Sequence, residues 1–196
     1  THQGVFDLAY LRCIPNIIIA APSNEVELRN LMYTAQLPQK KPLAIRYPRG
    51  RGVIKNWEVP FKEISIGTGK MLNEGSKVAI ISIGHIGNVV FDIIMEFKKT
   101  KIELGHCDLR FLKPLDKKLL HTILKQYPNI ITVEDGCLKG GMGSAILEFC
   151  SDNNYKNNIV RLGVPDQFIE HGSQAEQRSQ CGFDKIQITK VINELL

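Results

Sequence analysis

The second half of the chain alternates short apolar runs with helical patterns, and this alternation is the strongest constraint on its fold. The apolar runs are rich in β-branched residues and occupy residues 78–84, 102–108, 130–134 and 159–162. The helical patterns occupy residues 89–99, 114–126, 144–150, 175–180 and 184–195. Strands that alternate with helices of this length are typical of βαβ units, which build parallel sheets. We therefore predict an α/β fold with a mostly parallel sheet flanked by helices.

The first part of the chain carries a shorter version of the same pattern. Residues 5–12 have helical periodicity, and residues 17–21 read as a buried strand that suits a sheet covered on both faces. Ser23 is a good N-cap for the helix that follows, whose first turn is acidic. A second strand at residues 43–47 is closed by the sequence YPRGRG.

The character of the sequence changes after Gly52. Residues 53–75 contain several glycines and a proline and end on Asn-Glu-Gly, so we interpret them as a linker with a hairpin. The chain is thus expected to have three parts. These are a first domain part at residues 1–52, the linker at 53–75 and a second domain at 76–196.

Composition excludes several classes of protein. The 196 residues carry a net charge of +5 without a long basic run, which does not indicate a nucleic-acid-binding face. The five cysteines include no C-x-x-C pair, and the five histidines lack metal-ligand spacing. No apolar stretch reaches the length of a membrane span, and no signal peptide is visible. We expect a cytoplasmic protein with reduced cysteines, no metal site, no nucleic-acid partner and no membrane anchor.

Two residues are candidates for chemistry in the first 52 residues. Arg49 follows a strand and lies between a proline and a glycine, where its guanidinium suits an anionic ligand such as phosphate. Pairing of Arg49 with a nearby carboxylate is the alternative. His2 lies in a small polar segment before a helix and suits proton transfer near neutral pH, although a histidine so placed often has no role.

The glycine-rich loop 140–143 opens a helix after a strand. Glycines there would let a backbone approach a phosphate, but the spacing fits neither G-x-G-x-x-G nor a P-loop, which favours close helix–sheet packing. Glu134 and Asp135 at a strand end are either an acid pair or a loop or helix cap. The residues alone thus indicate an α/β protein that binds a phosphorylated small molecule.

The motifs taken together are more specific than any one of them. In order along the chain they are THQGVFDLAYLRCIPN, APSNEVEL, YPRG, FLKPLD, TVEDG, GGMGSA and LGVPDQFIEHG. This series resembles the transketolase group of thiamine-diphosphate enzymes over the whole chain. The resemblance implies that residues 1–52 are the later half of a pyrimidine-binding domain and residues 76–196 a transketolase C-terminal domain.

The resemblance also implies a reaction and a set of partners. The branch of the group that the chain resembles condenses pyruvate with glyceraldehyde 3-phosphate and releases carbon dioxide, using thiamine diphosphate and Mg²⁺ in a homodimer. His2 corresponds to an active-site histidine, and Arg49 to an arginine that binds the substrate phosphate. Arg12 and Asp7 are expected to tie their helix to its neighbours.

The family's activating glutamate and its diphosphate-binding motif would precede Thr1, so they are not in this sequence. The chain is therefore expected to be an inactive C-terminal fragment that holds no cofactor by itself. Two alternatives stay open. One is the β-subunit of a 2-oxoacid dehydrogenase E1 component, and the other is a non-catalytic dimerisation module.

Overall fold

The computed structural model describes residues 4–38 and 41–196. Within these residues five strands form one sheet in the order β3-β5-β4-β7-β8. They are β3 Lys70–Asn73, β4 Val78–Ile83, β5 Gly105–Asp108, β7 Asn129–Cys137 and β8 Asn158–Val164. Strand β3 runs antiparallel to β5, and the other neighbours run parallel. The prediction of a mostly parallel α/β sheet is confirmed.

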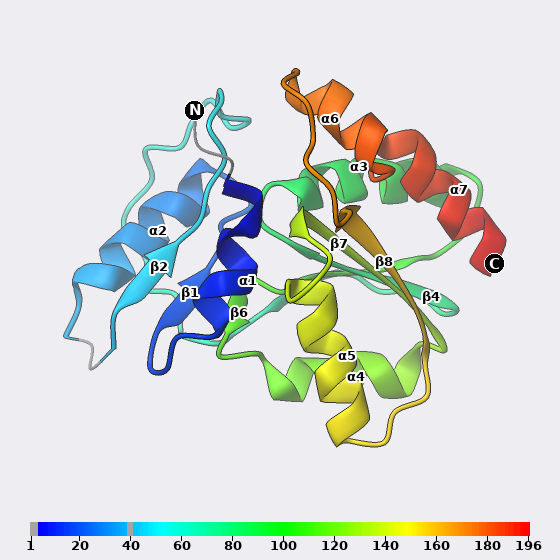
Figure 1. Cartoon of the computed structure of the whole chain (residues 1–196), viewed down its shortest axis with the longest axis horizontal. Helices are drawn as coiled ribbons and strands as arrows, with labels where there is room; N and C mark the ends of the chain where they lie inside the picture. The colour runs from blue at the N-terminus through cyan, green and yellow to red at the C-terminus, as the bar shows by residue number, and fades with distance from the viewer. Residues whose placement is uncertain (1–3, 39–40) are drawn as a thin grey trace.

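Helices cover both faces of this sheet (Figure 1). They are α3 Ile86–Lys99, α4 Lys117–Gln126, α5 Met142–Asp152, α6 Gln174–Cys181 and α7 Lys185–Leu195. One apolar cluster joins α3 and α7 to one face, and another joins α4 and α5 to the opposite face. Strand β4 is buried along its whole length because alternate side chains enter these two clusters. This double burial explains why its sequence is apolar throughout.

The first part of the chain folds beside this sheet. Its elements are the 3₁₀-helix η1 Gly4–Phe6, α1 Asp7–Arg12, β1 Ile18–Ala20, α2 Glu25–Gln36 and β2 Leu43–Ile45. In the described residues β1 and β2 belong to a three-stranded sheet, and the third strand is β6, Phe111–Lys113. Strand β6 was not predicted, and it comes from the second half of the chain (Figure 1). The two halves of the sequence therefore share a sheet.

Two local predictions were wrong. The N-cap of α2 is Asn24, whose Oδ1 accepts a hydrogen bond from the Glu27 amide at 3.0 Å, because the helix begins at Glu25 and not one residue earlier. Ser23 instead donates from Oγ to the Glu27 carboxylate at 2.8 Å. Residues 53–75 contain no hairpin, since β3 at their end pairs with β5.

The stretch before β3 packs along α2. The backbone N–H of Lys62 donates to Asn30 Oδ1 and that of Ile64 to Thr34 Oγ1, each at 2.9 Å. Ile64 is buried in the apolar cluster that β1, α2 and β6 form. Side chains of α2 thus satisfy backbone groups that a hairpin would have paired. None of the helices in the described ranges combines the length and apolar character that a membrane crossing needs.

Candidate functional site

The loop after β2 lies at the carboxyl end of its strand, where ligands of α/β sheets bind. The Arg46 amide donates to the Ala20 carbonyl at 2.8 Å, and the chain then leaves the sheet. Arg49 is exposed, and no described residue pairs with its guanidinium. The alternative in which a nearby carboxylate neutralises Arg49 is therefore not what the structure shows. The described residues thus leave its guanidinium without an ionic partner.

A groove of about 550 Å³ runs beside this loop. Its walls come from the start of α2, from residues 47–53, from the start of α3 and from α6. The arginines that line it are Arg51 and Arg178, and His85 lines it as well. Arg49 is not itself one of the lining residues, but its neighbours Pro48 and Gly50 both line the groove. This volume accommodates a small phosphorylated metabolite.

Glu25, in the first turn of α2, holds the far end of the loop. Its carboxylate accepts hydrogen bonds from the backbone N–H groups of Val53 and Ile54, the latter at 3.0 Å. A side chain at Gly52 would overlap this carboxylate and displace it, so the glycine allows the close approach. Packing against Glu25 thus explains the second glycine of YPRGRG, Gly52, without any ligand.

A charged cluster occupies the carboxyl ends of β4 and β7. His85 Nε2 lies 2.8 Å from Asp135 Oδ2, and an Arg178 nitrogen lies 3.6 Å from the same oxygen. Arg46 donates to the backbone carbonyl of Asp135. Burial by itself raises the pKa of Asp135, but His85 and the two arginines outweigh it and hold the pKa below its usual range. Asp135 is thus a stable anion.

The cluster of His85, Asp135 and Arg178 occupies the crevice that the large sheet would otherwise offer to a ligand. In the sheet, β5 lies on one side of β4 and β7 lies on the other. The boundary between β4 and β7 is therefore a topological switch point. The cavity beside Asp135 measures only about 50 Å³, little more than one water molecule occupies. The crevice is thus filled by the junction between the two halves, and the 550 Å³ groove is the better candidate site.

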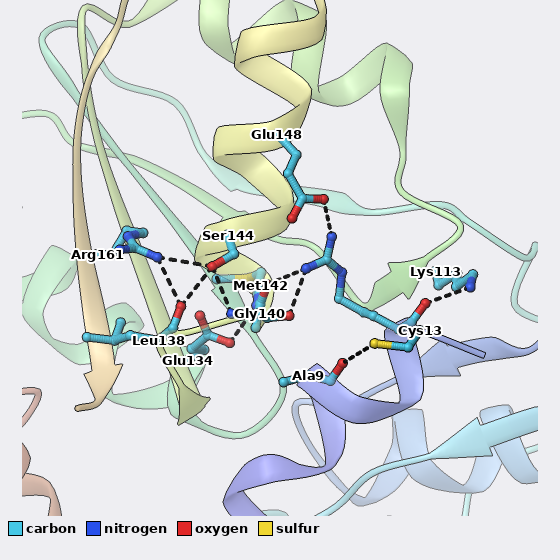
Figure 2. Close-up of polar contacts among 12 residues, drawn as sticks. Ala9, Cys13, Lys113, Glu134, Leu138, Gly140, Met142, Ser144, Glu148 and Arg161 are labelled. Carbon is cyan, nitrogen blue, oxygen red and sulfur yellow. Dashed lines mark hydrogen bonds and ion pairs between the residues drawn. The ribbon is translucent and has the colours of Figure 1, made fainter. Parts of the chain in front are cut away.

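Glu134 caps helix α5 (Figure 2). Its carboxylate accepts from the backbone N–H of Met142 at 2.6 Å and of Gly143 at 2.8 Å. Burial raises the pKa of Glu134, although these hydrogen bonds act to lower it. A side chain at Gly141 would overlap the Glu134 carboxylate. The acid-pair interpretation is therefore replaced by a helix cap, and the structural interpretation of the glycine loop is confirmed.

Arg12 and Asp7 have the structural roles expected of them. Arg12 donates to the Gly140 carbonyl at 2.7 Å and pairs with Glu148 of α5 (Figure 2). Asp7 lies 3.4 Å from Arg46 Nε. These contacts join α1 to the glycine loop and to the end of β2.

The predicted site residues can be compared with the candidate groove only in part. His2 lies outside the described residues, so its role stays a prediction. Arg49 belongs to the loop whose other residues line the groove, and the structure adds Glu25 and Gln174 as partners of this loop. Sequence reasoning missed Gln174 because a glutamine on a polar helix carries no distinguishing pattern. Within the described chain no group of three or more His, Cys, Asp or Glu side chains could hold a metal ion.

Family comparisons agree with this architecture. Residues 67–188 match the family described as the transketolase C-terminal domain, and residues 1–53 match the transketolase pyrimidine binding domain. A solved structure entitled "Split gene transketolase, inactive beta4 tetramer" superposes with a TM-score of 0.85 at 26% identity, covering 100% of this chain and 62% of that one.

Curated relatives are similar over the whole chain. The protein named 1-deoxy-D-xylulose-5-phosphate synthase from Cytophaga hutchinsonii is 54% identical over 196 residues, which is 100% of this chain and 31% of that protein. The synthase of the same name from Bacteroides fragilis is 55% identical over 195 residues, 99% of this chain and 30% of that protein. The chain thus spans about a third of the length of these relatives.

Proposed function

This chain belongs to the transketolase family, and on that premise we propose that it forms the C-terminal part of a 1-deoxy-D-xylulose-5-phosphate synthase. Such an enzyme condenses pyruvate with glyceraldehyde 3-phosphate, releases carbon dioxide and yields 1-deoxy-D-xylulose 5-phosphate for isoprenoid, thiamine and pyridoxal biosynthesis. Relatives that bear this name support the proposal. The remainder that they carry, on the same polypeptide or on another chain, completes the enzyme.

One observation in the structure carries the proposal. Arg49 is an exposed arginine that forms no ion pair with any described residue, and its loop is held on both sides and lines a groove of metabolite size. A guanidinium binds a phosphate through two parallel N–H···O contacts, which fixes both the position and the direction of the ligand. Arg49 thereby holds glyceraldehyde 3-phosphate with its aldehyde oriented for attack.

His2 has the second role. In the assembled enzyme it donates a hydrogen bond to the substrate oxygen on which negative charge develops, and it moves a proton there. An imidazole suits this task because its ordinary pKa lies near neutral pH. The prediction rests on the resemblance of the THQG segment.

The cofactor is thiamine diphosphate, which supplies the carbanion-stabilising chemistry when it is bound. The residues that the structure describes do not fit a complete site for it, because no cluster of carboxylates or histidines there could hold the accompanying Mg²⁺. We assign the cofactor and the metal to the remainder of the assembled enzyme, which works in the cytoplasm as a homodimer.

The chain by itself is inactive under this proposal. It lacks the activating glutamate and the diphosphate-binding motif of the family, so neither half of the cofactor site is complete. The neighbour whose title reads "Split gene transketolase, inactive beta4 tetramer" supports this expectation. Turnover of pyruvate and glyceraldehyde 3-phosphate by the purified 196-residue chain would contradict it.

The experiment is a steady-state comparison in the assembled enzyme. Arg49→Ala removes a charge-assisted contact worth about 1.5–3 kcal/mol, so the KM for glyceraldehyde 3-phosphate should rise about tenfold to a hundredfold. The KM for pyruvate should not change. Arg49→Lys keeps the charge without the planar fork and should recover part of the loss. An unchanged KM for glyceraldehyde 3-phosphate in Arg49→Ala would reject the phosphate site.

The same preparation separates the two alternatives. An E1-type subunit would need a lipoyl acceptor in place of glyceraldehyde 3-phosphate. A non-catalytic dimerisation module would self-associate without cofactor and show no effect of Arg49→Ala. The synthase names of the relatives favour neither of these alternatives.

A further inference from the structure

We infer that Gln174 on α6 is a positioning residue that holds the 47–53 loop so that Arg49 meets the substrate phosphate. The inference rests on the proposed role of Arg49. It gives the C-terminal domain a part in substrate binding that the sequence did not indicate. Gln174 itself does not touch the phosphate, since its contact is with the loop backbone.

The Gln174 side-chain amide is fixed at both ends. Its Nε2 donates to the Arg49 carbonyl at 2.9 Å, and its Oε1 accepts from an Arg178 nitrogen at 3.1 Å. A donor is needed on one side and an acceptor on the other, so only one orientation of the amide satisfies both partners. The Gln174 amide can therefore form both hydrogen bonds only when the loop backbone points the Arg49 carbonyl toward it.

The base of this tether is rigid. Gln174 is the first residue of α6, and the helix starts with a capping box between Ser173 and Glu176. Arg178, one turn later on the same helix, is anchored at the Asp135 and His85 cluster. A continuous series of polar contacts thus runs from the end of β7 to the carbonyl of Arg49.

The loop is held from two sides. Gln174 binds it before Gly50, and Glu25 of α2 binds it after Gly52 through two backbone N–H groups. Both tethers contact the backbone only, so neither Gln174 nor Glu25 occupies the Arg49 guanidinium. A loop fixed at its backbone loses less conformational entropy when its side chain binds a ligand, so the tethers strengthen phosphate binding.

The test uses two near-isosteric variants in the assembled enzyme. Gln174→Met keeps the size of the side chain and removes both hydrogen bonds. Gln174→Glu keeps the acceptor for Arg178 but places a carboxylate oxygen against the Arg49 carbonyl. The control is Gln180→Met, which changes an exposed glutamine on the same helix. Both Gln174 variants should raise the KM for glyceraldehyde 3-phosphate about threefold to tenfold, as expected for one neutral hydrogen bond. The KM for pyruvate and kcat should stay the same.

A second readout does not depend on activity. Trypsin cleaves after arginine, and a released loop exposes the bond after Arg49. In the isolated chain both Gln174 variants should be cleaved there several times faster than the parent, while Gln180→Met should match the parent. Wild-type cleavage rates in the Gln174 variants would overturn the tether.

The outcomes distinguish this inference from the proposed function. If Arg49→Ala raises the KM for glyceraldehyde 3-phosphate and the Gln174 variants do not, the positioning role is overturned and the phosphate site stands. If Arg49→Ala also leaves that KM unchanged, both are overturned. A rise for pyruvate as large as that for glyceraldehyde 3-phosphate would show general damage and would overturn the positioning role.

Discussion

The buried histidine of β5 gives the sharpest prediction about stability. His106 has no exposed surface, and its Nε2 lies 2.9 Å from Ser82 Oγ. Its Nδ1 is buried and has no hydrogen-bond partner among the described residues. Burial therefore lowers the pKa of His106 from 6.5 to about 4, since a charged imidazole there would lose its hydration without compensation.

This difference makes stability depend on pH in a defined window. Above pH 6.5 the His106 imidazole is neutral in both the folded and the unfolded chain, so it does not contribute to the pH dependence of stability. Between pH 6.5 and 4 the unfolded chain binds a proton that the folded chain does not, so the free energy of unfolding falls as the pH falls. Over this window the loss amounts to about 3 kcal/mol, at about 1.4 kcal/mol for each pH unit. Below pH 4 both states are charged and the dependence ends.

Urea unfolding of the parent chain and of His106→Gln measures this term. The variant is destabilised at every pH by altered packing, so the informative quantity is the difference between the two curves. That difference should shrink by about 2–3 kcal/mol between pH 7.5 and pH 4.5, because only the parent carries the histidine penalty. His171→Gln, which changes an exposed histidine, is the matched control. Parallel curves for the parent and His106→Gln would refute the reasoning.

Three further changes test the packing. Glu134→Ala leaves two buried N–H groups of α5 without an acceptor, so it should lower the free energy of unfolding in urea by about 2–4 kcal/mol. A loss below 1 kcal/mol would contradict the role of Glu134 as a helix cap. Phe111→Ala empties the buried junction between the two halves and should cost about 3–5 kcal/mol in the same assay, whereas a near-neutral effect would show that β6 is not needed. Gly52→Ala displaces the Glu25 carboxylate and should speed tryptic cleavage of the loop, and unchanged cleavage would argue against this tether.

The sequence predicted those elements whose signal is local. The buried strand β4 and the amphipathic helices α3 and α4 follow from apolar periodicity, which their own residues carry. Strand β6 has only three residues, and it is a strand because it pairs with β1, about 90 positions earlier. No local pattern contains that information. The hairpin prediction failed for the same reason, since the partners of its backbone lie on α2.

The residues of the candidate site also differ in whether a local sequence pattern reveals them. Arg49 could be singled out because a strand end followed by proline and glycine is a recognisable setting for an anion-binding arginine. Gln174 was missed, since its importance comes from the carbonyl that α6 happens to face. Glu134 was singled out as an acidic residue, but its role as a cap became clear only when the N–H groups of α5 were seen beside it.

The most direct test of the account compares two aldehydes in the assembled enzyme. Glyceraldehyde 3-phosphate and unphosphorylated glyceraldehyde differ only in the group that Arg49 is proposed to bind. Arg49→Ala should lower kcat/KM for the phosphorylated aldehyde about tenfold to a hundredfold and leave kcat/KM for glyceraldehyde unchanged. An equal loss for both aldehydes would contradict the assignment of Arg49 to the substrate phosphate.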